Sequence, residues 1–220
     1  MYHSVGDSGP TFCTGESPFL KQLDFLRAHR LPVPLGTGVS DSPLAAAITF
    51  DDGYLDNYTF AIPACVERGI PVTVFVAWEP LGSLSFRGGL PMMTREHVRE
   101  IAAMPGVSIG SHTLSHPKLS RLSPEDQLRE VRDSRKVLED WLGRTVDTFC
   151  YPFGDYSEVT VRAVAESGYR LAVTTRVGTY SSSASPYEIP RVAVNRFSES
   201  VFPQILTQGY QRYAALAGKC

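Results

Sequence analysis

Apolar residues along this chain follow two alternating patterns. Short continuous runs rich in β-branched and aromatic residues are typical of buried strands. They occupy residues 45–50, 72–76, 107–110, 149–151, 171–174 and 189–194. The segments between them carry apolar residues at helical spacing, which predicts helices beginning at Ser17, Thr94 and Ser123 and helices at 56–68, 157–167 and 202–216. Strands and helices repeated in this order predict a parallel sheet with helices packed outside it.

Capping residues mark several helix limits. Ser17-Pro18 and Ser123-Pro124 each place a good N-cap residue before a proline that suits the first helical position. Gly69 and Gly168 follow two of the helical segments and are suitable C-caps. The sequence therefore indicates where these helices begin and end.

Polar residues cluster just after the predicted strands. Asp51 and Asp52 follow residues 45–50, His112 follows 107–110, and the turn 151–154 follows another strand. A (β/α) barrel places its chemistry at this end of its strands, which favours a barrel over an open sheet. We expect one barrel domain spanning residues 1–220, with the Gly/Ser-rich loops 82–89 and 179–186 bordering a cleft.

Composition narrows the picture only slightly. A chain of 220 residues suits one barrel-sized domain, and its net charge of −2 gives no reason to expect a nucleic-acid partner. The longest apolar stretch, 70–78, is too short to span a membrane. The first residues, 1–5, have neither the basic start nor the apolar segment of a signal peptide, which predicts a cytoplasmic protein unless upstream residues were removed. The four scattered cysteines indicate reduced thiols, and the oligomeric state stays open.

The candidate chemistry lies in two short motifs. Asp51-Asp52 is one, and His112 with His116 is the other. Two histidines at i, i+4 can point the same way off one helical turn. A carboxylate and two imidazoles make a three-ligand site for a borderline metal such as zinc and leave one position open for water or substrate. If the neighbouring Asp deprotonates that water, these residues predict metal-assisted hydrolysis.

These motifs resemble a known family. Thr49-Phe50-Asp51-Asp52-Gly53 together with Ser111-His112-Thr113-Leu114-Ser115-His116 resembles the polysaccharide deacetylases of carbohydrate esterase family 4, and Phe149-Cys150-Tyr151-Pro152-Phe153-Gly154 looks like a variant of their third motif. The resemblance implies an irregular (β/α)₇ barrel. It also implies a divalent metal, usually Zn²⁺, and hydrolysis of an N-acetyl or O-acetyl group on a sugar. An Asp-His-His site also accepts Co²⁺, Ni²⁺ or Fe²⁺.

The resemblance assigns roles to individual residues. It implies that Asp51 is the catalytic base and that Asp52, His112 and His116 are the metal ligands. It further implies that the backbone N–H of Phe153 stabilises the oxyanion that forms during hydrolysis. The division of labour agrees with the chemistry, since a metal lowers the pKa of its water and a nearby carboxylate can accept the proton.

Two departures from the family pattern point to substitutes. Cys150 stands where the third motif usually has an Arg, and no His follows His116 although the fifth motif usually supplies one as the general acid. The start Met1-Tyr2-His3 is similar to a branch with a rearranged barrel, the deacetylases of exported poly-N-acetylglucosamine, in which this motif lies at the N-terminus. His3 is therefore the candidate acid, and Arg191 is the candidate replacement for the missing Arg.

Three aromatic residues, Trp78, Tyr151 and Phe153, are candidates for binding a sugar ring. The favoured function is metal-dependent removal of an N-acetyl group from an amino sugar in a polymer, an oligosaccharide or a small conjugate. The alternatives are an O-acetyl esterase acting on a xylan-like sugar and a non-catalytic carbohydrate-binding domain. The position of His3 relative to the metal ligands discriminates between catalysis and binding alone.

Overall fold

The computed structural model describes residues 1–36, 42, 44–181 and 184–207. Its centre is a parallel five-stranded sheet in the order β3-β4-β5-β6-β7. The strands are β3 (Ile48–Phe50), β4 (Val72–Val76), β5 (Val107–Ser111), β6 (Thr148–Cys150) and β7 (Leu171–Val173). Every residue of β3, β4, β6 and β7 is buried, as expected for a parallel sheet covered by helices.

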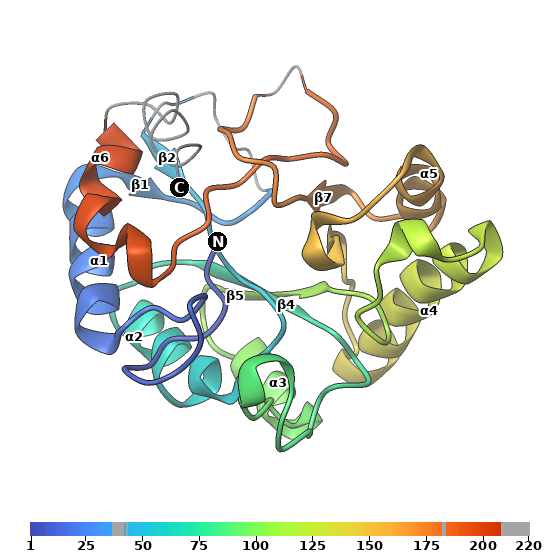
Figure 1. The fold of residues 1–220 in the computed structure, drawn as a ribbon, viewed down its shortest axis with the longest axis horizontal. Helices are drawn as coiled ribbons and strands as arrows, with labels where there is room; N and C mark the ends of the chain where they lie inside the picture. The colour runs from blue at the N-terminus through green and yellow to red at the C-terminus, as the bar shows by residue number, and fades with distance from the viewer. Residues whose placement is uncertain (37–41, 43, 182–183, 208–220) are drawn as a thin grey trace.

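Helices surround this sheet (Figure 1). They are α1 (Glu16–His29), α2 (Ile62–Glu67), α3 (Arg95–Ala102), α4 (Pro124–Leu142), α5 (Glu158–Glu166) and α6 (Phe202–Thr207). A π-helical turn, Asn57–Ala61, leads directly into α2. Thr94 and Ser123 cap α3 and α4 as predicted, and Gly143 ends α4 in the left-handed conformation.

Two non-strand segments join the edges of the sheet. At one edge, Tyr2 N donates to Thr49 O at 2.8 Å and lies beside β3. At the other edge, Ile189 forms a bridge with Val173 of β7. The two segments then meet, because Val194 N donates to Met1 O and Met1 N donates to Val192 O, both at 2.9 Å. The sheet is therefore closed into an irregular barrel, which confirms the predicted fold class.

An aromatic cluster holds the N-terminal segment in place. Tyr2 packs edge-on against Phe19 of α1, with ring centroids 5.3 Å apart, and stacks on Phe50 of β3 at 5.6 Å. The Tyr2 hydroxyl also donates to Gln22 Oε1 at 2.9 Å. These contacts fix the direction of the chain at its next residue, His3.

Some predicted boundaries are wrong. Ser17 is not the N-cap of α1, because the helix begins at Glu16 and its N-cap is Gly15. Residues 189–194 do not form a strand and make only the single bridge of Ile189. Residues 45–50 form two strands, and β2 (Ala45–Ala46) pairs with the unpredicted β1 (Leu31–Pro32). The last helix begins at Phe202 as expected, but residues 208–216 of that prediction lie outside the described part of the chain.

The described cysteines Cys13, Cys65 and Cys150 are free thiols, as their spacing predicts. Within the part of the chain that the structure describes, no helix combines the length and apolar character that crossing a membrane requires.

Candidate active site

The predicted chemical residues converge on one cavity at the C-terminal ends of the strands. Its volume is about 270 Å³. Asp51 and Asp52 reach it from the end of β3, and His112 and His116 reach it from the loop after β5. The full lining is His3, Asp51, Asp52, Arg87, His112, His116, Tyr151, Phe153 and Thr175. Residues separated by more than 170 positions in the sequence thus share one small polar space.

Asp52, His112 and His116 form a cluster suited to a metal ion. Asp52 Oδ1 lies 3.2 Å from His112 Nε2 and 3.1 Å from His116 Nε2. One potential ligand atom from each residue lies within 4.8 Å of the others. Both Asp52 oxygens and His116 Nε2 are buried and have no well-formed hydrogen bond to any described residue. Because unpaired buried polar atoms are costly, this donor set fits a divalent metal.

A neighbouring carbonyl orients one of the imidazoles. His112 Nδ1 lies 2.7 Å from the carbonyl oxygen of Cys150, which accepts a hydrogen bond from the ring. This contact places one proton on Nδ1 and turns Nε2 toward Asp52, the side from which a metal would bind. Metal-binding histidines are typically held by such a second hydrogen bond.

The two histidines do not converge from a helical turn, so that part of the prediction is wrong. They lie in an irregular loop between β5 and the short helical turn Leu119–Arg121. Thr113 and His116 have positive φ angles of 73° and 63°, and these left-handed residues turn the chain back on itself. Asp52 and Phe153, with φ of 74° and 60°, are the other non-glycine residues of this kind among those described.

Backbone strain is therefore concentrated at the site. Left-handed conformations are unfavourable for residues with a side chain and persist where the surrounding structure enforces them. All four such residues in the described chain are candidate ligands, cavity residues or neighbours of a candidate ligand. Such clustering is typical of a site that is held ready for its ligand.

Arg191 binds Asp51 through two hydrogen bonds. Its Nη1 and Nη2 donate to Asp51 Oδ1 and Oδ2, each at 2.7 Å. The guanidinium is itself oriented by bonds to Thr174 O at 2.9 Å and Thr49 Oγ1 at 3.0 Å. Cys150 Sγ lies 3.1 Å from Arg191 Nη2 and 3.5 Å from Asp51 Oδ2. The cysteine occupies the space beside the pair and does not take the place of the arginine's charge.

These contacts set the charge of both carboxylates. Burial alone would raise the pKa of Asp51, but the Arg191 guanidinium outweighs it and lowers the pKa to about 2. Burial is likewise opposed at Asp52, where His112 and His116 hold the pKa well below 3.8. Both side chains are therefore carboxylates at neutral pH. One is paired with arginine, and the other faces the imidazoles.

The pKa values of His112 and His116 are shifted in opposite directions. Burial lowers the pKa of His116 and favours the neutral ring, the form that binds metals. Burial would also lower the pKa of His112, but Cys150 and Asp52 outweigh it and raise that pKa well above 6.5. A metal entering the cluster would therefore displace a proton from His112.

His3 lines the same cavity as the four motif residues. Its carbonyl accepts a hydrogen bond from Asn57 Nδ2 at 2.8 Å, and its ring lies 5.7 Å from the ring of Phe12. Burial lowers the pKa of its imidazole, although Asp51 and Asp52 oppose the shift. His3 thus shares the cavity with the four motif residues, and its burial favours the neutral ring.

The three predicted sugar-binding aromatics are placed differently. The exposed ring of Phe153 lies edge-on against His116, with centroids 4.7 Å apart, at the cavity. Tyr151 also lines the cavity, but it is fully buried and its hydroxyl donates to Tyr187 O. Trp78 is absent from the lining and packs beside α3 and α4 between Arg95 and Trp141.

Two lining residues, Arg87 and Thr175, had no sequence motif to identify them. Arg87 belongs to the loop 82–89. The sequence predicted that this loop borders a cleft, but it did not identify Arg87 as the residue that reaches the cavity. Thr175 follows β7, and only its place after a predicted strand could have suggested it.

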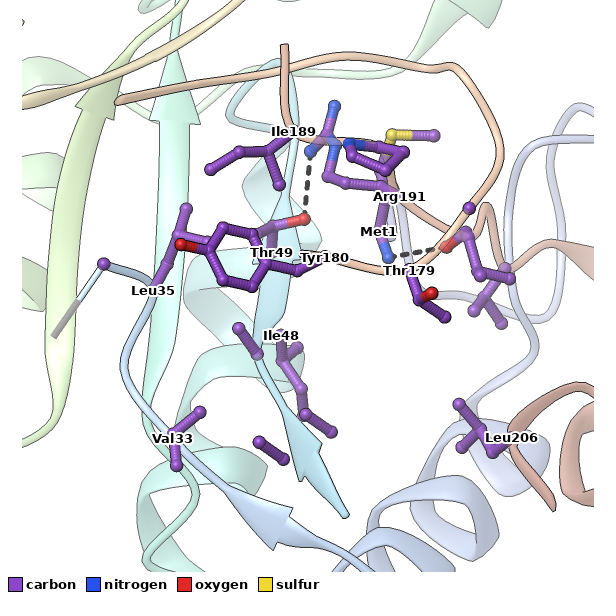
Figure 2. Close-up of a pocket in the computed structure, with 18 of the residues that line it drawn as sticks. Met1, Val33, Leu35, Ile48, Thr49, Thr179, Tyr180, Ile189, Arg191 and Leu206 are labelled. Carbon is purple, nitrogen blue, oxygen red and sulfur yellow. Dashed lines mark hydrogen bonds between the residues drawn. The ribbon is translucent and has the colours of Figure 1, made fainter. Parts of the chain in front are cut away.

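A second, larger cavity of about 490 Å³ lies among β3, α1, α6 and the segments 178–180 and 186–194 (Figure 2). Most of its lining is aliphatic, including Leu26, Val33, Ile48 and Ile189. Part of the predicted cleft loop 179–186 borders this cavity and not the polar one. Arg191 lines this larger cavity, and Figure 2 shows its hydrogen bond to Thr49.

The fold and the cluster together define a barrel hydrolase, and the comparisons agree. The model of the polysaccharide deacetylase family matches residues 39–172, which contain Asp51, Asp52, His112 and His116. The chain is also 31% identical over 203 residues to YxkH of Bacillus subtilis, named for the same family, covering 89% of this chain and 70% of that protein. This chain belongs to the polysaccharide deacetylase family.

The branch suggested by the N-terminal motif is also supported. Over 156 residues the chain is 23% identical to the poly-β-1,6-N-acetyl-D-glucosamine N-deacetylase of Staphylococcus epidermidis, which covers 67% of this chain and 54% of that enzyme. The solved structure of IcaB from Ammonifex degensii matches with a TM-score of 0.81 and 26% identity over 93% of both chains. The Streptococcus pyogenes deacetylase PplD shares the fold, with a TM-score of 0.80 and 24% identity over 95% of both chains.

Proposed function

We propose that this protein uses one divalent metal to hydrolyse the N-acetyl group of an acetylated amino sugar. The observation that carries the proposal is that Asp51, which is paired with Arg191, lines the same cavity as the Asp52, His112 and His116 cluster. A domain that only binds carbohydrate does not require a buried, ionised carboxylate beside a metal site. The position of His3 in the same cavity also favours catalysis over binding alone.

Asp52, His112 and His116 would hold the metal, and Zn²⁺ suits this nitrogen and oxygen donor set, with Co²⁺, Ni²⁺ and Fe²⁺ as alternatives. The bound metal would polarise the acetyl carbonyl and lower the pKa of the attacking water. The chain's own residues would provide the remaining steps, because each has a separate position around the cavity.

Asp51 would accept a proton from the attacking water. Arg191 keeps it ionised and fixes both carboxylate oxygens, at the cost of lowering its basicity. The left-handed conformation of Phe153 would present its backbone N–H to the oxyanion that develops on the acetyl group. His3 would take up a proton from solvent when substrate binds and deliver it to the departing nitrogen, while Asp51 later returns the proton of the attacking water to solvent.

An acetyl ester is the second candidate substrate. The lowered pKa of His3 favours it, since a ring that is rarely protonated is a weak general acid. An alcohol leaves a tetrahedral intermediate with less help than an amine does. The two substrates are therefore separated by how strongly hydrolysis depends on His3.

Acetate release tests the proposal directly. The Zn²⁺-loaded protein would be incubated with N-acetylated amino sugars, chito-oligosaccharides and O-acetylated xylan, with metal-stripped protein as the control. We expect acetate from an N-acetylated sugar only when the metal is present. Release from O-acetyl xylan alone would support the esterase, whereas binding without acetate release from any substrate would support a binding domain.

A further inference from the structure

Two cations lie at the polar cavity: Arg87 lines it, and Lys118 lies beside it near Phe153. The guanidinium of Arg87 lies over the exposed ring of Phe153, 4.3 Å from its centroid, and Lys118 Nζ lies 5.6 Å from the same centroid. Among the described residues, neither side chain forms a hydrogen bond with a carboxylate, and only Arg87 comes near one. That approach is 4.0 Å, from Arg87 Nη1 to Asp52 Oδ2.

Arg87 does not provide a hydrogen bond to Asp52. Both oxygens of Asp52 lack a well-formed hydrogen bond within the described structure, so the five guanidinium N–H groups stay available. When a metal engages Asp52, the weak attraction at 4.0 Å is opposed by the metal's own charge. Arg87 would then be free to bind a different negative group.

The loop that carries Arg87 is held in place over the cavity. Phe86 N donates to Leu90 O at 2.8 Å, and Met92 N donates to Ser83 O at 2.9 Å. Gly88 has a φ of 73°, and a Cβ at this position would lie only 2.5 Å from Pro10 Cγ. The loop therefore packs against the segment around Pro10, which gives Arg87 a defined position near the ligands.

Without a metal, the charges around the cavity nearly balance, because Arg87 and Lys118 stand against Asp52 and Asp155. Asp51 is already paired with Arg191, and the outlying Asp155 accepts two hydrogen bonds from Ser120. Glu188 lies near Arg176, with a closest approach of 3.7 Å, and accepts a hydrogen bond from Tyr156. A bound divalent metal would offset the charge of Asp52 and leave this part of the described structure with an excess of positive charge.

We propose that Arg87, assisted by Lys118, selects amino sugars that carry an anionic group close to the acetamide that is cleaved. The inference rests on the proposed deacetylase function. A guanidinium binds a carboxylate or a phosphate through two parallel hydrogen bonds, so either anion satisfies this chemistry. The short distance from Arg87 to Asp52 places the anion on the same sugar as the acetyl group or on a substituent bonded directly to it.

Steady-state kinetics with three sugars tests the selection and identifies the anion. The substrates are neutral N-acetylglucosamine, N-acetylmuramic acid with its carboxylate, and N-acetylglucosamine carrying a phosphate at O6. We expect a lower KM for at least one anionic sugar than for the neutral one. In Arg87→Gln the preference in kcat/KM should fall about tenfold, the effect of losing one charge-assisted contact. Arg87→Lys should restore part of it.

Arg121→Gln is the matched control, because Arg121 is an exposed arginine near the end of the same His116 loop and does not line the cavity. Equal loss of preference in this variant would show a general effect of surface charge and overturn the proposal. If the preference survives in Arg87→Gln, the anion binds the metal and not Arg87, and the proposal is wrong. Equal kcat/KM for all three sugars in the parent enzyme would also refute it.

Calorimetric binding to the Zn²⁺-loaded Asp51→Asn variant separates this inference from the proposed function. If no sugar is deacetylated but the anionic sugar binds tighter than the neutral one, and Arg87→Gln removes the difference, the reaction assignment fails and the selection stands. If acetate is released but binding and kcat/KM ignore the anion, the selection fails and the deacetylase assignment stands.

Discussion

The two cavities of this protein differ in size and polarity, and Arg191 connects them, because it lines the larger one and binds Asp51 of the smaller one. The larger, of about 490 Å³, is lined mostly by aliphatic side chains, whereas the smaller, of about 270 Å³, contains two carboxylates and three imidazoles. The smaller cavity also contains unpaired buried oxygens and strained backbone. Size is therefore a poor guide to function here. The costly features identify the site, because folding alone would not retain them.

The largest effect is expected when a ligand is removed from the small cavity. His112→Ala should abolish stoichiometric binding of Zn²⁺ and all activity, since two remaining ligands hold a metal weakly. Elemental analysis and acetate release measure both. His29→Ala, which changes an exposed histidine on α1, is the control. Full metal content in His112→Ala would contradict the ligand assignment.

Replacing Asp51 should separate chemistry from metal binding. Asp51→Asn keeps the shape but cannot accept a proton, so kcat should fall by roughly 10²–10⁴-fold while the metal content stays the same. The readouts are elemental analysis and steady-state kinetics on one preparation. If the metal disappears together with the activity, Asp51 is a ligand and the roles of the two aspartates need revision.

His3 should matter for amides more than for esters. We expect His3→Ala to slow amide hydrolysis by roughly 10²–10⁴-fold with unchanged metal content. Hydrolysis of an activated acetyl ester should fall much less, because its leaving group needs little protonation. Rates on the two substrates, compared in the same variant, decide the matter: equal losses would exclude a role as general acid.

Arg191 tests the connection between the two cavities through stability. Arg191→Met leaves Asp51 buried without its partner and should lower the free energy of unfolding by about 3–5 kcal/mol at pH 7. Asp51 has its pKa lowered from 3.8 to about 2, so this stabilisation is present above pH 3.8 and fades as the pH falls toward 2. Urea denaturation at several pH values should therefore show the difference shrinking in acid. A difference independent of pH would assign the loss to the bonds with Thr49 and Thr174 alone.

A substitution in the large cavity should lower the stability of the protein without changing its catalytic rate. Leu26→Ala, which enlarges the cavity from the α1 side, should cost about 2 kcal/mol, the low end for such a change because the side chain already borders empty space. Thermal or urea unfolding measures the loss, and kcat should not change. A matching fall in kcat would show that the apolar cavity influences Asp51 through Arg191.

The sequence predicted the parts of the site that are local. Asp52 follows a short buried strand, and His112 follows another, so their meeting at one end of a parallel sheet could be inferred. The loop geometry of His116 could not, because its left-handed turns leave no trace in hydrophobic spacing. His3 and Arg191 were found only through the family resemblance and its missing residues.

Long-range packing explains what was missed. Arg87 reaches the cavity because its loop packs against Pro10, a contact that no local pattern encodes. Residues 189–194 have the composition of a strand, yet they bridge β7 at one residue and then turn to meet Met1. Trp78 follows a strand at the correct end of the sheet, but α3 and α4 offer it cation–π and aromatic partners away from the cavity.

The closure of the barrel by its two distant segments has a consequence for synthesis of the chain. His3 leaves the ribosome long before Arg191, which holds Asp51 and lies almost two hundred residues further along the chain. Contacts between such remote segments form late in folding, since a long loop must close first. A nascent chain shorter than this would have every metal ligand and still lack an oriented base, so catalytic competence should arrive only with the last part of the barrel.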